Sequence, residues 1–227
     1  MSTSITRGLS FVAIPAAILL FGASVLGGRS SVATTLPDPL FDAPRAVASA
    51  EETAVFAGGC FWGVEAVYEH VKGVKSVVSG YAGGTVASPD YETVSTGTTG
   101  HAESVRVVFD PAVVSYGDLL RVFFSVAHDP TQKNRQGPDV GTQYRSAIFY
   151  ATDQQKEIAE RYIKQLTDAK TFSRPIVTDV SRLKAFYPAE EYHQDYLKHH
   201  PDQPYIVIND QPKVRNLQKQ FPELWRD

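Results

Sequence analysis

Cys60 is the residue of this sequence best suited to covalent chemistry, and it is the only cysteine among 227 residues. It stands in the stretch FAGGCFWGVEAVYE, between two glycines and two large aromatic residues. A lone thiol can neither close a disulfide within the chain nor supply two thiolates to a metal ion. Cys60 is therefore either a small buried residue or a nucleophile that acts through its thiolate.

The residues around Cys60 place it at a turn between a strand and a helix. Residues 53–57 are β-prone, two glycines end them, and apolar residues recur at helical spacing from Phe61 onward. A thiol at a helix N-terminus meets unpaired N–H groups and the positive end of the helix dipole, so we expect the thiolate to be favoured. The glycines leave space above the sulfur, and Phe61 and Trp62 are placed to wall an apolar pocket.

An acidic residue shares a strand face with apolar side chains in the segment HAESVRVVFD. The alternation puts Glu103 on the same face as Val105, Val107 and Phe109. Desolvation on such a face raises the pKa of a carboxyl group. We therefore expect Glu103 to hold a proton near neutral pH.

Strands and helices alternate along the rest of the chain without an internal repeat, which favours an α/β or α+β layered sandwich. Ser115 and Asp118 resemble a capping pair for the helix YGDLLRVFFSVA. A polar loop of about seventeen residues follows, and loops of that length are often functional. SAIFYA is expected as a strand, the next helix has Asp153 at its cap, and PIVTDV is expected as a further strand.

Composition limits the classes of partner. The 22 basic and 25 acidic residues give a net charge of -3, and no basic run suggests a surface for nucleic acid. With 43% hydrophobic residues, the chain is long enough for one domain and an appendage. We expect one domain, a monomer, and no nucleic-acid partner.

The first residues have the composition of a targeting segment. An uncharged apolar run at residues 11–27 lies between Arg7 and Arg29, as in a secretory signal or an uncleaved membrane anchor. Residues 29–50 have scattered prolines and small residues, which is typical of a linker. We expect residues 1–28 to be a signal peptide or anchor, 29–50 a linker, and 51–227 an exported catalytic domain, periplasmic, secreted or anchored to a membrane.

Several motifs occur in one order across the chain: GGCFWG, GYAGG, PDYETVSTGTTGHAE, FFSVAHDPTQ, DVGTQYRSAIFY and EEYHQDYL. Together they resemble the peptide-methionine (S)-S-oxide reductase A family, in its single-cysteine form. The resemblance covers residues 55–205 and implies an α+β fold of one domain. The implied architecture is a two-layer α/β sandwich with a mixed sheet and a ferredoxin-like core.

The resemblance also implies a reaction and roles for particular residues. Cys60 matches the nucleophile that attacks the sulfur of methionine-S-sulfoxide, free or in proteins, and leaves methionine and a Cys60 sulfenic acid. Glu103 matches a proton donor, and Tyr91 and Tyr144 match tyrosines beside it. Phe61 and Trp62 match an aromatic cage for the substrate methyl group, and Asp139 matches a further polar residue of the site. No metal or organic cofactor is implied.

The chain departs from many relatives of this kind in one respect. They carry further cysteines near the C-terminus that resolve the sulfenic acid, and the C-terminal segment here has none. The expected reductant is therefore external, either a thioredoxin-like protein or a small thiol. The implied physiological role is repair of oxidative damage.

Two other classes of protein remain open at this point. In a cysteine amidase or protease, His101 or His193 would be the base for Cys60, so an imidazole would lie next to the sulfur. In a binding module, the many tyrosine and phenylalanine residues would stack on glycans or peptides, and Cys60→Ser would keep function. His199 and His200 lack the spacing of helical metal ligands.

Overall fold

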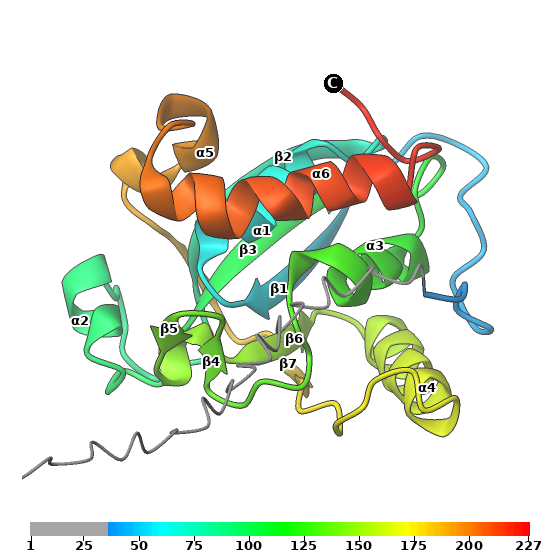
Figure 1. Cartoon of the computed structure of the whole chain (residues 1–227). Helices are drawn as coiled ribbons and strands as arrows, with labels where there is room; N and C mark the ends of the chain where they lie inside the picture. Colours follow the sequence, from blue (N-terminus) through cyan, green and yellow to red (C-terminus); the bar gives the residue numbers. More distant parts are fainter. Residues whose placement is uncertain (1–35) are drawn as a thin grey trace, which may run out of the picture. The chain divides into compact units, whose positions relative to one another are not determined.

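The computed structural model describes residues 36–227, and its centre is a six-stranded sheet in the order β7-β6-β1-β3-β2-β8 (Figure 1). All neighbouring strands are antiparallel except β6 and β7, which are parallel, so the sheet is mixed. The strands of this sheet are β1 (Glu52–Gly58), β2 (Val74–Ala82), β3 (Ala102–Phe109), β6 (Ser146–Tyr150), β7 (Asp179–Arg182) and β8 (Phe186–Pro188).

Residues 36–227 form six α-helices, three of which have at least nine residues. They are α1 (Phe61–Glu69), α2 (Tyr91–Ser95), α3 (Tyr116–Val122), α4 (Asp153–Asp168), α5 (Tyr196–His199) and α6 (Gln211–Gln220). Two π-helical segments, Phe123–Ala127 and Ile206–Asp210, adjoin α3 and α6, and short 3-10 turns cover Thr142–Tyr144 and Glu191–His193. None of the helices in this described part is both long and apolar enough to cross a bilayer.

Four strands and two helices form a ferredoxin-like core, as expected from the family resemblance. In chain order β1, α1, β2, β3, α3 and β6 are a βαββαβ unit, and its strands lie side by side as β6-β1-β3-β2. The predicted alternation of β3 is confirmed, because Glu103, Val105, Val107 and Phe109 are all buried. Side chains from α1, α3, α4 and α6 join one face of the sheet in the larger hydrophobic core.

The predicted long loop contains a small hairpin. Strands β4 (Arg135–Gln136) and β5 (Asp139–Val140) pair antiparallel, and a 3-10 turn ending at Tyr144 leads into β6. The predicted capping pair is confirmed, because the Ser115 hydroxyl accepts from the Asp118 N–H at 3.0 Å while the Asp118 carboxylate accepts from the Ser115 N–H at 2.9 Å. Both features lie in the segment that connects β3 to β6.

Two predicted element boundaries were wrong. Thr152, rather than Asp153, caps α4, because its backbone is extended and its hydroxyl accepts from the Gln155 N–H at 3.1 Å. The PIVTDV segment becomes strand only at Asp179, because the Val177 N–H donates to the carbonyl of Pro130 at 2.8 Å instead of pairing with β6.

Residues 36–50, within the predicted linker, form no helix or strand but pack onto the domain. Leu36 is buried, and the Tyr162 hydroxyl donates to the Pro37 carbonyl at 2.8 Å. The Gly117 N–H donates to the Asp42 carboxylate at 2.9 Å, and Arg45 pairs with Asp118. The predicted signal or anchor at residues 1–28 lies outside the described residues.

Candidate active site

Cys60 lies at the turn between β1 and α1, as predicted, and is the N-cap residue of α1. The turn requires glycine at position 59, which has a φ of +91°. A Cβ there would lie 2.5 Å from the Cβ and Cγ of Gln136 in β4. The short hairpin therefore packs directly against the turn that holds Cys60, whose side chain is only 7% exposed.

Glu103 of β3 lies beside the same turn. Its Oε2 accepts a hydrogen bond from the Phe61 backbone N–H at 3.1 Å, and the residue is 2% exposed. Burial raises the pKa of Glu103 to about 8, the Phe61 N–H lowers it, and the carboxylates of Asp139 and Asp210 raise it further. The expected protonation of Glu103 near neutral pH follows from this environment.

The pKa of the Cys60 thiol corrects the expectation that the helix N-terminus favours thiolate. Burial raises this pKa well above its ordinary value, and the carboxyl groups of Glu103 and Asp210 raise it further. The Trp62 backbone N–H and the Lys213 ammonium act in the opposite direction but do not outweigh burial. Cys60 is therefore a neutral thiol in the protein without substrate.

Tyr91 and Tyr144 reach the same place from two separate segments. Tyr91 is the first residue of α2, and Tyr144 ends the 3-10 turn before β6. Burial raises the pKa of both phenols, and the charges of Glu103 and Cys60 raise them further. Both hydroxyls thus keep their protons near neutral pH and can donate hydrogen bonds toward the thiol and the acid.

Asp139 is held by a tyrosine that the sequence analysis did not select. The Tyr205 hydroxyl donates to Asp139 Oδ2 at 2.5 Å. Burial raises the pKa of Tyr205, and the negative charges of Cys60 and Asp139 contribute, which places this phenol at the site as well. Tyr205 follows the last of the recognised motifs, and its aromatic character was the only signal available.

The aromatic side of the site contains more residues than the predicted pair. Phe61 is 1% exposed and part of the hydrophobic core, whereas Trp62 is half-buried. The Tyr196 ring stacks on the Trp62 ring with a centroid separation of 3.8 Å and an angle of 7°. The Trp62 indole N–H donates to His193 Nδ1 at 3.2 Å. Tyr196 and His193 thus fix the orientation of Trp62.

The buried histidines serve structural contacts. The His101 ring bonds to the Gly84 N–H and the Val86 carbonyl, and the His128 ring bonds to the Phe123 carbonyl and the Ser146 hydroxyl. Within residues 36–227, no imidazole is hydrogen-bonded to Cys60, which is the contact that a cysteine hydrolase would need.

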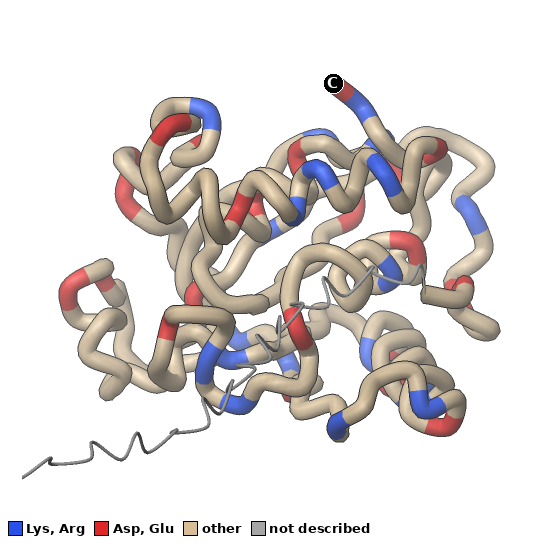
Figure 2. Tube along the Cα trace, in the orientation of Figure 1, with Lys and Arg blue, Asp and Glu red and all other residues tan. Residues whose placement is uncertain are grey.

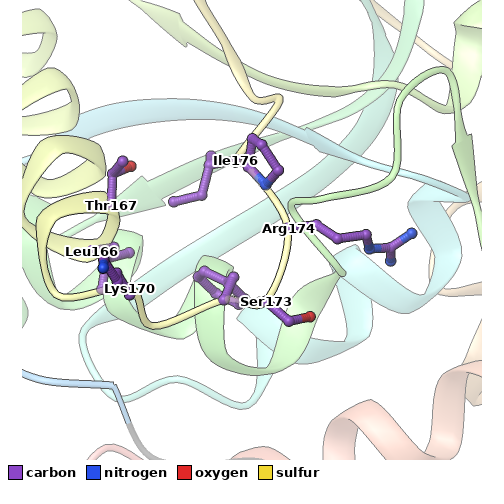
Figure 3. A pocket seen from close by; sticks show the side chains of 8 residues that line it. Leu166, Thr167, Lys170, Ser173, Arg174 and Ile176 are labelled. Atoms are coloured by element: carbon purple, nitrogen blue, oxygen red, sulfur yellow. The ribbon is translucent and has the colours of Figure 1, made fainter.

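A pocket near the end of α4 is separate from these residues (Figure 3). It encloses about 440 Å³ and is lined by the end of α4 and the segment that follows it, including Lys170 and Arg174. It contains none of the seven predicted site residues. Basic and acidic residues are interspersed along the described chain, as Figure 2 shows.

The structure therefore brings Cys60, Glu103, Tyr91 and Tyr144 together. Phe61 joins them through its backbone N–H bond to Glu103, Trp62 through its backbone N–H near Cys60, and Asp139 through Tyr205. Comparison with known proteins identifies the family to which the chain is similar. The family model described as "Peptide methionine sulfoxide reductase" matches residues 52–224. A peptide methionine sulfoxide reductase MsrA 2 of Mesorhizobium japonicum is 60% identical over 180 residues, which are 79% of this chain and 92% of that protein.

Two solved structures have a similar fold. The reduced form of Mxr1 from Saccharomyces cerevisiae superimposes with a TM-score of 0.60 at 34% identity, over 70% of this chain and 90% of that one. Methionine sulfoxide reductase A of Corynebacterium diphtheriae gives 0.58 at 40% identity, over 66% and 76%. The chain belongs to the peptide methionine sulfoxide reductase family, in its MsrA branch.

Proposed function

We propose that Cys60 is the nucleophile that reduces methionine-S-sulfoxide, free or within oxidised proteins, to methionine. The thiol sulfur attacks the sulfoxide sulfur, the S–O bond of the substrate breaks, and the oxygen ends on Cys60 as a sulfenic acid. The thiol plus the sulfoxide thus give the thioether plus Cys60–SOH, so atoms and electrons balance. The enzyme class is peptide-methionine (S)-S-oxide reductase, which repairs oxidative damage.

The observation that carries this proposal is a buried carboxyl group, Glu103, hydrogen-bonded to the turn that holds the buried Cys60 thiol. Sulfoxide oxygen leaves only after it has gained a proton, and Glu103, with a pKa of about 8, holds one near pH 7. Only one of its oxygens accepts a hydrogen bond within residues 36–227, from the Phe61 N–H. The other is free to donate to the substrate.

The remaining residues orient the substrate. Tyr91 and Tyr144 are protonated phenols near Glu103, so they can donate hydrogen bonds to the sulfoxide oxygen as its S–O bond breaks. Trp62, with the buried Phe61 ring packed beside it, offers an apolar surface for the substrate methyl group. Asp139 is fixed by Tyr205 and lies at the polar side of the site. Preference for the S epimer would follow if the apolar side binds the methyl group while the polar side binds the sulfoxide oxygen.

Regeneration of Cys60 requires a thiol from another molecule, because this chain has one cysteine. A first external thiol displaces water from Cys60–SOH and forms a mixed disulfide, and a second thiol releases Cys60 and leaves an external disulfide. We propose a thioredoxin-like protein or a small thiol as the reductant. No metal or organic cofactor takes part in these steps.

The test is the stoichiometry of one turnover without reductant. The enzyme should form about one methionine per chain and then stop, and a sulfenic-acid reagent should label Cys60. Addition of a thioredoxin-like protein or a small thiol should restart turnover. Repeated turnover of sulfoxide with no reductant present would disprove the single-thiol mechanism, whereas steady hydrolysis of an amide would identify a hydrolase.

We also propose that the protein acts outside the cytoplasm. The support is the uncharged run at residues 11–27 between two arginines, followed by the proline-containing segment. A reporter fused after Ala50 should be active only outside the cytoplasm. Full-length protein found soluble in the cytoplasm with residues 1–27 intact would contradict this proposal.

A further inference from the structure

A buried ion pair lies beside the candidate active site and has no part in the mechanism above. Asp210 ends the π-helical segment Ile206–Asp210, and Lys213 lies in the first turn of α6. The Lys213 Nζ is 3.0 Å from Asp210 Oδ1. The Asp210 side chain is fully buried and that of Lys213 is 17% exposed, so both charges lie largely out of water.

The pair packs against the first turn of α1, whose N-cap residue is Cys60. Gly63 is the third residue of α1 and lies three residues after the N-cap Cys60. A Cβ on Gly63 would overlap Asp210 Oδ1 and would lie 2.7 Å from the Lys213 Nζ. Only glycine at this position therefore allows both charged groups to approach the first turn of α1, next to the turn that holds Cys60.

The carboxylate of Asp210 is incompletely satisfied. Its Oδ2 is buried and has no hydrogen-bond partner among the described residues, and Lys213 contacts only the other oxygen. A buried charge with an unsatisfied oxygen costs free energy, so the pair is a poor way to stabilise the fold. Its position points to an electrostatic effect on a neighbouring group.

Cys60 is a neighbour whose pKa the two charges of the pair shift in opposite directions. The Asp210 charge raises the pKa of the thiol, and the Lys213 charge lowers it. The groups that face the site from the packed elements are Glu103 on β3, Tyr91 on α2, Tyr144 before β6, Asp139 on β5, Tyr205, Asp210 and Lys213. Glu103 and the three tyrosines are neutral near pH 7, so they contribute no net charge there.

We propose that Asp210 and Lys213 are positioning residues that set the fraction of Cys60 present as thiolate. Asp210 keeps the resting thiol protonated, and Lys213 limits that effect with an opposite charge. A protonated thiol reacts slowly with soluble oxidants and electrophiles, so the nucleophile is preserved until a sulfoxide and the proton of Glu103 are both in place. This inference rests on the proposed role of Cys60 as the nucleophile.

Alkylation of Cys60 tests the proposal independently of sulfoxide reduction. Because the chain has one cysteine, the rate of iodoacetamide labelling of the full-length protein, followed by mass spectrometry from pH 6 to 11, reports Cys60 alone. Asp210→Asn should lower the midpoint of the pH profile by about one pH unit and speed labelling at pH 7 by about tenfold. Lys213→Met should raise the midpoint by about one pH unit.

The double variant should have a midpoint between those of the two single variants, at or slightly below that of the wild type, because Asp210 raises the pKa of the thiol more than Lys213 lowers it. Lys219→Met removes an exposed lysine from the same helix and should leave the profile unchanged. The opposite signs of the two single variants separate an electrostatic role from a structural one, which would move both rates in one direction. Thermal unfolding of each variant verifies that it is folded, and the isosteric Asp210→Asn decides the matter if Lys213→Met does not fold.

An unchanged midpoint in Asp210→Asn, or shifts of the same sign in the two single variants, would overturn the proposal. The proposed enzymatic function fails separately, by absence of methionine formation in the wild-type protein. Normal methionine formation with unmoved alkylation profiles would thus reject the role of the pair and leave the reductase assignment intact.

Discussion

Glu103 on β3 and Glu65 on α1 are two buried acids with similar ionisation and different surroundings. Each is 2% exposed, and burial raises the pKa of each to about 8. Each also accepts a backbone N–H hydrogen bond. The two carboxyl groups would be difficult to distinguish by burial or by pKa alone.

They differ in what their oxygens contact. Both oxygens of Glu65 are used, by the Ser79 N–H at 3.3 Å and by the Asp195 N–H at 3.1 Å, so this acid joins β2 to the segment before α5. Glu103 has one oxygen free within the described part of the chain, and its charge acts on the Cys60 thiol. A perturbed pKa therefore identifies a candidate acid, and a free oxygen next to a nucleophile identifies a catalytic one.

The largest expected effect is on the rate of the chemical step. Glu103→Gln should lower the single-turnover rate of methionine formation by about 10²–10⁴-fold, because the amide cannot supply the proton. Glu65→Gln is the matched control, and it should keep the rate within about threefold if its only contacts are to backbone N–H groups. A folded Glu103→Gln variant with near-normal turnover would remove the proton-donor role.

The second prediction concerns stability against pH. The folded-state pKa of Glu65 lies above its unfolded value, so the native state binds more protons between about pH 4.5 and pH 8. The free energy of unfolding should therefore fall as pH rises through that range, by on the order of 3–5 kcal/mol for this group. Glu65→Gln should flatten the decline, measured by urea unfolding at several pH values. Identical slopes in both proteins would show that Glu65 is not buried as described.

The elements of the fold that depend on local pattern were predictable from the sequence. The alternation of β3, the turn at Cys60 and the capping pair at the start of α3 each rest on residues within a few positions of one another. One wrong boundary was a shift of a single residue, since Thr152 rather than Asp153 caps α4, and the other arose where a distant contact took over, as the Val177 N–H bonded to Pro130. Periodicity cannot reveal such a contact, because it involves residues far apart in the sequence.

The same distinction applies to the site. Motif resemblance selected Glu103 and Asp139, but Tyr205 reaches Asp139 across 66 residues and His193 reaches Trp62 across 131. The expected thiolate was wrong because the helix N-terminus is a local feature, whereas the burial and the carboxyl groups that oppose it come from the tertiary structure. Local chemistry could be read from the sequence, and its electrostatic balance could not.

The third prediction uses the ionisation of Glu103. Above about pH 8 this acid loses its proton, so the single-turnover rate should fall by about tenfold per pH unit once thiolate formation no longer compensates. Glu65→Gln should keep this alkaline decline, and Glu103→Gln should lose it together with most of the rate. An alkaline decline of equal slope in Glu103→Gln would assign it to another group.

The smallest expected effect is at Lys198, which pairs with Glu69 and Asp195, the two acids whose charges raise the pKa of Glu65. Lys198 lies 2.6 Å from Glu69 and 2.5 Å from Asp195, but its side chain is 51% exposed, so water screens both pairs. Burial already raises the pKa of Glu69 to about 7, and without the ammonium this acid would take up a proton rather than remain charged. Lys198→Met should therefore lower the free energy of unfolding at pH 7 by less than about 1 kcal/mol and leave the single-turnover rate within about twofold. Urea unfolding and methionine formation measure the two quantities. A larger loss of rate would mean that these charges hold Tyr196 against Trp62, and the region around Glu65 would then belong to the active site after all.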